Sequence, residues 1–194
     1  MLAMPPSAKI DKATALQAAY ELVRSDGPSA VTARNLARRL GCSTQPIFRI
    51  WRSMDELKRD LFTYANAQFA EYLMRPSTEG NQFLGVGLRY VQYAKEEPNL
   101  FAMMFMSGAV ESDNLVELFT SGAGNIEIMK MIPAFAGCTS EQIQDLFAKI
   151  AIFTHGMACL VATNDIPFAP ATVSALLTDI FRALSQDAAR QRTD

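Results

Sequence analysis

The sequence of 194 residues has few of the residues that disulfide frameworks and metal sites require. Its three cysteines, Cys42, Cys138 and Cys159, are odd in number and widely spaced, which indicates reduced thiols. The single histidine, His155, lies four residues before Cys159, so that both side chains could share one helix face. Two ligands do not make a tetrahedral site, and we therefore expect no metal and no cofactor.

Long apolar runs and export signals are also missing. The longest apolar runs, such as 101–106 and 157–162, fall well short of the roughly 20 residues of a membrane-spanning helix. The opening segment MLAMPPSAKIDK holds two prolines and no apolar stretch long enough for a secretory signal. We therefore expect a cytoplasmic protein with no membrane partner.

Enzyme fingerprints are lacking as well. The sequence contains no GxSxG, P-loop or Rossmann pattern, and its carboxylates show no inward-facing pair. The single histidine lies in an apolar segment, where no base pairs with a nucleophile. We expect no catalysis, and a helical enzyme acting on an apolar substrate stays open as an alternative.

The composition that is present is that of a globular protein, with 49% apolar and 20% charged residues. The net charge of −2 is unevenly distributed. Residues 1–60 hold ten Lys and Arg against six Asp and Glu, whereas residues 61–194 hold eight against fourteen. A polyanion would be attracted to one end only, although an excess of this size also occurs as ordinary surface variation.

Apolar spacing predicts two helices near the N-terminus. The first begins near Ile10 and is stopped by the segment Ser25-Asp26-Gly27-Pro28. The second is capped by Thr32 and ended by Gly41. These two helices are separated by only a few residues, as in a helical hairpin.

A short third helix and a long fourth one follow. Ser43 is expected to cap a helix from about Thr44 to Ile50, with Pro46 in its first turn. Ser53 and Glu56 have the spacing of a capping box ahead of the long helix.

The remaining sequence stays helical, so that the whole chain is expected to be all-α with about nine helices. The segments 140–161 and 171–184 are the longest late helices. Because 140–161 is apolar around most of its circumference, it needs cover on all sides. A homodimer formed through these two helices would supply that cover, and wrapping by the chain's own helices is the alternative.

The second and third helices fit a helix-turn-helix, whose second helix would enter the DNA major groove. A helical hairpin that has a glycine turn and exposed arginines by chance is the alternative at this point. Arginines and short hydroxyls on the exposed faces suit phosphate, and Gln45 and Arg49 have side chains that read base edges. The expected DNA-binding residues are Thr32, Arg34, Ser43, Thr44, Gln45, Phe48, Arg49 and Arg52.

The order of DGPSAVT, ARNLARRLGCST and IFRIWRSMDELKRDLF resembles the DNA-binding domain of the TetR family of bacterial transcriptional regulators, over about residues 9–73. The segments RYVQYAKEEPNLFAMMF and HGMACLVATNDIPF look like pieces of a WHG-type ligand-binding domain. The resemblance implies a homodimeric regulator, typically a repressor, that binds a pseudo-palindromic operator in double-stranded DNA. It also implies a small-molecule effector bound in the C-terminal domain.

The resemblance implies phosphate contacts at Thr32, Ser43 and Thr44, and base contacts at Arg34, Gln45 and Arg49. The chain departs from the family at three positions: Phe48 replaces a usual tyrosine, Ile50 a common histidine and Met54 a common lysine. These departures put three phosphate contacts in doubt. A hydrophobic-ligand carrier whose DNA head has lost function is therefore a further alternative.

The expected domains are an N-terminal arm at 1–8, a DNA-binding domain at 9–56, an effector-binding and dimerisation domain at 57–187, and a tail at 188–194, with both ends disordered. Phenylalanines and methionines after residue 80 suit an apolar pocket or a plain core. The expected ligand-binding residues are Phe101, Met104, Phe105, Met129, Phe153 and Met157, and Arg89, Gln92, Tyr93 and Asn99 could orient a polar group. His155 could contact a ligand, or bond a backbone carbonyl or a polar group across the dimer seam.

Overall fold

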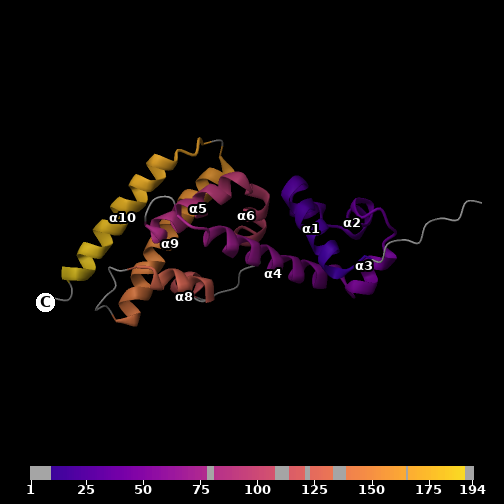
Figure 1. Cartoon of the computed structure of the whole chain (residues 1–194), viewed down its shortest axis with the longest axis horizontal. Coiled ribbons are helices and arrows are strands. Elements are labelled where there is room, and N and C mark those ends of the chain that lie inside the picture. Colours follow the sequence, from indigo (N-terminus) through magenta and orange to yellow (C-terminus); the bar gives the residue numbers. More distant parts are fainter. Residues whose placement is uncertain are drawn as a thin grey trace, which may run out of the picture. The chain divides into compact units, whose positions relative to one another are not determined.

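The computed structural model describes residues 10–77, 81–107, 114–120, 123–132, 139–164 and 166–190. These ranges contain α-helices, one short 3-10 helix and no strand, which confirms the predicted all-α fold (Figure 1). The helices are α1 (Lys12–Asp26), η1 (Pro28–Ala30), α2 (Ala33–Arg39), α3 (Gln45–Ile50), α4 (Met54–Leu73), α5 (Gln82–Glu96), α6 (Pro98–Phe105), α7 (Leu115–Thr120), α8 (Ala123–Lys130), α9 (Ser140–Thr163) and α10 (Pro170–Arg190).

The chain divides into two compact units. Unit 1 holds the described residues within 1–69 and 99–109, and unit 2 those within 70–98 and 110–194. The division does not follow chain order, because nearly all of α6 groups with α1 to α4 in unit 1. The predicted N-terminal arm lies outside the described residues, and α10 continues to Arg190, past the expected end of the last helix.

Unit 1 has an apolar core to which α1 to α4 and α6 contribute buried side chains. The fully or almost fully buried members are Ala15, Ala19, Val23, Leu36, Ile47, Trp51, Leu57, Leu61, Ala65, Leu100, Phe101 and Met104. The ring of Phe105 lies between two other rings, with centroids 5.0 Å from Phe101 and 5.4 Å from Phe69. Burial of this apolar surface is the main term that stabilises the unit.

Helix α6 is tied to the end of α1 by a polar contact. Asn99 Nδ2 donates to the carbonyl oxygen of Arg24 at 3.1 Å, which satisfies one of the last carbonyls of α1. Gly27 follows with a φ of 83°, in the region that favours glycine. A Cβ at Gly27 would lie 3.6 Å from Asn99 Oδ1, an ordinary contact distance, so the backbone conformation and not the available space requires the glycine.

Side-chain caps begin several helices as the sequence predicts, with two differences. Thr32 Oγ1 accepts from Asn35 N at 3.1 Å, which confirms the cap of α2. The expectation for Ser43 is wrong, since Thr44 is the N-cap of α3 and makes no side-chain cap bond. Ser53 Oγ accepts from Glu56 N, but the Glu56 carboxylate accepts from Arg52 N, one residue before the position of a full capping box.

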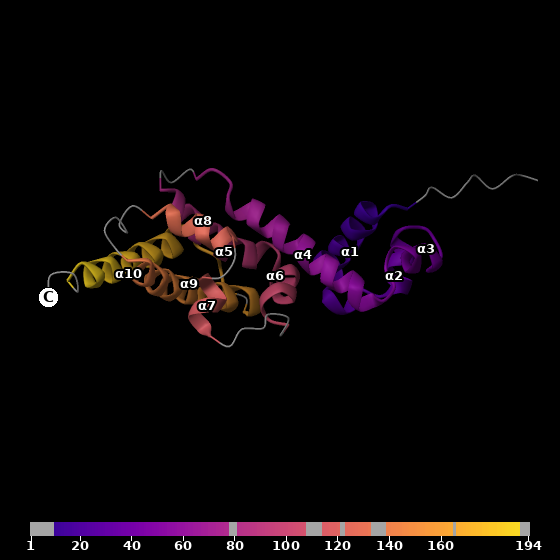
Figure 2. The same ribbon diagram turned by 90° about the horizontal axis from the view of Figure 1, so that it is seen from below.

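Unit 2 is built around α9, which contacts α5, α7, α8 and α10 (Figure 2). Thr139 and Gln142 form a complete capping box at its start. Helix α10 also contacts α5, where Leu177 Cδ1 would lie 3.0 Å from a Cβ at Gly87. The glycine therefore permits a close approach of α5 and α10.

Helix α9 also has the length and apolar character of a membrane-spanning helix, with a mean hydropathy of 1.6 over its most apolar window. The short apolar runs did not predict this, because single residues such as Thr154 and Gly156 interrupt the apolar sequence of this helix. About two fifths of that window (39%) is buried within the protein, and the core helix of a soluble protein passes the same test.

Candidate nucleic-acid interface

The turn between α2 and α3 is determined by backbone hydrogen bonds and one glycine. Gly41 N donates to Arg38 O at 3.2 Å, and Cys42 N donates to Ala37 O at 3.0 Å. This pair of bonds is a Schellman motif, which requires a left-handed residue directly after the helix. Gly41 has a φ of 64°, so the glycine in this turn has a conformational role.

Helix α3 is held against unit 1 by its apolar side. Ile47 and Trp51 are each 1% exposed. The indole Nε1 of Trp51 donates to Asp60 Oδ2 at 2.6 Å, and Lys12 Nζ lies 2.7 Å from the same oxygen. Hydrogen bonds from Lys12 and Trp51 hold the pKa of the Asp60 carboxyl below its usual value. This carboxylate therefore joins α1, the end of α3 and α4.

The opposite side of α3 faces solvent. Gln45, Phe48 and Arg49 are all exposed, and their spacing of three and four residues places them on one face of the helix. Phe48 is 49% exposed, which is unusual for a phenylalanine in a well-packed unit. In the described part of the chain, no hydrogen-bond acceptor or donor engages the Gln45 amide or the Arg49 guanidinium. This outward face has the side chains of a base-reading surface.

The other expected DNA-binding residues surround this face. Arg34 in α2 is exposed, as are Ser43 and Thr44 in the turn and Arg52 after α3. The Thr32 hydroxyl already accepts a bond from Asn35 N, but its own proton can still be donated to a phosphate. All eight residues expected from the sequence thus lie on α2 or α3, in the turn between them, or directly beside these helices.

The expected ligand-binding residues are divided between the two units. Phe101 and Met104 are fully buried in the core of unit 1, where Phe105 is half-buried beside Phe101. Met129, Phe153 and Met157 belong to unit 2, and each is half-buried. Within unit 1 the structure brings Phe101 and Phe105 together, and these two rings pack as core.

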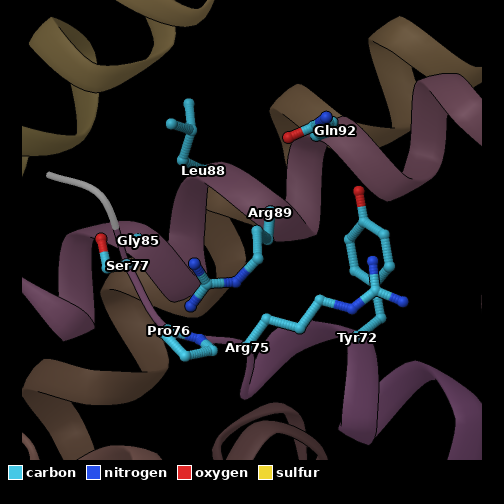
Figure 3. A pocket seen from close by; sticks show the side chains of 8 residues that line it. All are labelled: Tyr72, Arg75, Pro76, Ser77, Gly85, Leu88, Arg89 and Gln92. Carbon is cyan, nitrogen blue, oxygen red and sulfur yellow. The ribbon is translucent and has the colours of Figure 1, made fainter.

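The four residues expected to orient a polar group of the ligand are also divided between the two units. Asn99 bonds the end of α1 in unit 1, and Tyr93 is 2% exposed in unit 2. Arg89 and Gln92 line a pocket in unit 2, together with residues that the sequence analysis did not select (Figure 3). Three of the lining residues come from the segment Arg75-Pro76-Ser77. In the sequence, the proline and the short polar side chain of this segment were the only local features that could have indicated a site.

Comparison with known proteins assigns the first part of the chain. Residues 15–61 match the family described as bacterial regulatory proteins, tetR family. The match spans most of α1, all of α2 and α3, and the beginning of α4, and so includes the exposed face described above. No curated protein matches the chain at a significant level.

Proposed function

We propose that this chain, in which residues 15–61 carry the DNA-binding domain of the tetR family, is a sequence-specific transcriptional regulator, acting as a repressor. The observation that carries the proposal is the outward face of α3, where Gln45 and Arg49 are exposed beside a glycine turn. Gln pairs with adenine and Arg with guanine in the major groove, which admits one α-helix. The regulator acts by binding and not by catalysis.

Phosphate contacts orient this helix on the duplex. Thr32, Ser43 and Thr44 offer hydroxyl groups, and Arg34, Arg49 and Arg52 offer charge-assisted donors. Arg38 contributes less to such contacts, because its Nη2 already donates to Asn35 Oδ1. Phe48, Ile50 and Met54 provide no such donor, so we expect the interface to release fewer counterions than one with tyrosine, histidine and lysine there.

The regulator is proposed to be a homodimer that uses α9 and α10. Ile152, Gly156 and Leu160 are exposed on α9 at spacings of four residues, and Leu176 is exposed on α10. Among the described residues, no atom outside the helix lies within 4 Å of a Cβ built at Gly156, so a second helix could approach closely there. A large apolar face without cover is typical of an interface between subunits.

A small, largely apolar effector in a WHG-type C-terminal domain is proposed to control operator affinity. The half-buried side chains of Met129, Phe153 and Met157 in unit 2 support this part of the proposal, since they present adaptable apolar surface. Nearly all of helix α6 belongs to the unit that contains α3. A change in the position of α6 would therefore alter the packing of the DNA-reading helices.

The proposal is tested by a mobility-shift assay on the DNA flanking the coding region, with a salt titration. A specific shift is expected, on a pseudo-palindromic site whose half-sites match the roughly 34 Å repeat of the double helix. Arg34→Ala or Gln45→Ala should weaken binding by about 1–3 kcal/mol and relax preference at one base pair per half-site. The exposed Arg182→Ala in α10 is the control and should bind as the wild type does. No shift even at low salt would favour the hydrophobic-ligand carrier.

A further inference from the structure

A pocket of ≈ 260 Å³ lies in unit 2 between the end of α4, the segment that follows it and one face of α5 (Figure 3). It is lined by Tyr72, Arg75, Pro76, Ser77, Gly85, Leu88, Arg89 and Gln92. The lining holds two guanidinium groups and no carboxylate. None of these residues belongs to the proposed DNA-binding surface or to the expected apolar wall.

Arg89 is the central polar group of this pocket. Its Nε donates to the carbonyl oxygen of Leu73 at 2.8 Å, which satisfies an unpaired carbonyl in the last turn of α4. Its Nη2 is buried and has no hydrogen-bond acceptor among the described residues. A buried donor without an acceptor is unfavourable, and a charged one more so, unless a ligand supplies the acceptor.

Gly85 allows the polar groups to converge. A Cβ at this position would overlap Ser77 Oγ and would lie 3.1 Å from Arg89 Nη1. The missing side chain therefore lets the Ser77 side chain and the Arg89 guanidinium approach the same part of α5. Figure 3 shows the Arg89 guanidinium turned towards Pro76 and Ser77.

The charges around the pocket favour an anion. A second guanidinium in the lining, that of Arg75, lies 4.5 Å from the centroid of the Tyr72 ring. Burial lowers the pKa of Arg89, and the positive charge of Arg75 acts in the same direction. The nearby carboxylate of Glu96 accepts from Tyr72 Oη at 2.8 Å and from Gln92 Nε2 at 2.7 Å, so each of its oxygens already has a donor.

We infer that this pocket binds a small organic anion whose carboxylate or phosphate oxygens accept hydrogen bonds from Arg89 Nη2. Leu88, Pro76 and the Tyr72 ring would contact the apolar part of the ligand, and Arg75 would attract it by charge. The volume has room for on the order of nine water-sized groups, which limits the ligand to about the size of benzoate. The inference does not rest on the proposed DNA-binding function, because the site lies within unit 2.

The test is a titration of the full-length protein without DNA, at constant ionic strength, with sodium benzoate and with inorganic phosphate. Sodium chloride is the reference salt. We expect a saturable rise in melting temperature with at least one of the two anions, and a matching heat in calorimetry. A response to benzoate alone identifies a carboxylate ligand, and a response to phosphate alone identifies a phosphoryl ligand.

Three variants distinguish a loss of anion binding from a loss of folded structure. Arg89→Gln should weaken the response at least tenfold, because the guanidinium donors are lost. Leu88→Glu leaves Arg89 in place and adds a repelling carboxylate to the wall, so it should weaken the response while the circular dichroism stays that of the wild type. Arg182→Gln, on the exposed side of α10, should respond as the wild type does. The inference is overturned if neither anion exceeds chloride, or if Arg89→Gln and Leu88→Glu both keep the wild-type affinity.

Discussion

The hydroxyl oxygen of Tyr90 in α5 lies 3.0 Å from Nδ1 of His155 in α9, although 65 residues separate them in the sequence. The other ring nitrogen, Nε2, lies 3.3 Å from Cys159 Sγ, one turn along α9. The Phe119 ring of α7 packs edge-on against the imidazole, with centroids 5.7 Å apart. His155 therefore joins three helices of unit 2, and the side chains of Tyr90 and Cys159 are among its partners.

Burial lowers the pKa of His155 from its ordinary value of 6.5. Because this is the only histidine, proton NMR should show a single imidazole titration, with a midpoint below 6.5. The unfolded chain takes up a proton near pH 6.5 and the folded chain does so only at lower pH. The stability associated with His155 should therefore be full above pH 6.5 and decline as the pH falls towards the lowered pKa.

His155→Gln should remove this part of the pH dependence. The measurement is the difference in melting temperature between wild type and variant, which should shrink as the pH falls below 6.5. Tyr90→Phe is the companion variant, since it removes the hydroxyl partner of Nδ1 and keeps the ring. A titration midpoint at or above 6.5 would contradict the prediction.

Phe48→Tyr should strengthen DNA binding and make it more dependent on salt. The phenylalanine ring is exposed on the outward face of α3, where a phenol hydroxyl could donate to a phosphate. One added phosphate contact should steepen the plot of log affinity against log salt by about one unit. An unchanged slope, with unchanged affinity, would show that the ring does not face the DNA backbone.

Phe48→Ala tests the apolar use of the same ring. Phenylalanine can contact the methyl group of thymine, so this variant should lose preference at one base pair, by about 1 kcal/mol. The salt slope should stay as in the wild type, because no phosphate contact is removed. A competition assay with single-base operator variants measures the change.

Gly41→Ala should destabilise unit 1 by about 1–2 kcal/mol, because alanine is strained at a φ of 64°. Apart from its two chain neighbours, no described atom lies within 4 Å of a Cβ built there, so the loss comes from the backbone alone. Gly41→Asn should recover much of the stability, since asparagine tolerates the left-handed region. Gly124→Ala, in α8, is the control for an open site and should not destabilise the protein. Urea unfolding, followed by the single Trp51, reports on unit 1.

Leu160→Glu should separate the proposed dimer. Leu160 is 57% exposed and Ile152 is 43% exposed on the same stripe of α9, so a carboxylate there would be desolvated at the subunit interface. Light scattering should give about twice the chain mass of 21.3 kDa for the wild type and the chain mass for the variant. Gly124→Glu adds the same charge on α8 and should stay dimeric. A wild-type protein with the mass of one chain at micromolar concentration would contradict the interface.

Most of the helix boundaries were predictable from short stretches of sequence. Thr32, Gly41 and the segment from Ser25 to Pro28 act within a few residues of the backbone groups that they satisfy or interrupt. The start of α9 at Ser140 follows from Thr139 and Gln142 in the same way. The cap of α3 was predicted one residue too early, because burial of Ile47 and Trp51 decides where that short helix begins, and burial is a tertiary property.

The sequence alone determined the helical character of the chain, the two-helix motif and the residue types on the exposed faces of that motif, since helix periodicity and turn chemistry are local. Only the tertiary structure decided that nearly all of α6 joins unit 1, that Phe101 and Met104 are core, and that the Tyr90 hydroxyl lies beside His155. It also decided that the side chains of Arg89 and Ser77 both lie beside Gly85. Contacts between residues far apart in the chain depend on how helices pack, and side-chain spacing along one helix carries no information about which other helix will cover it.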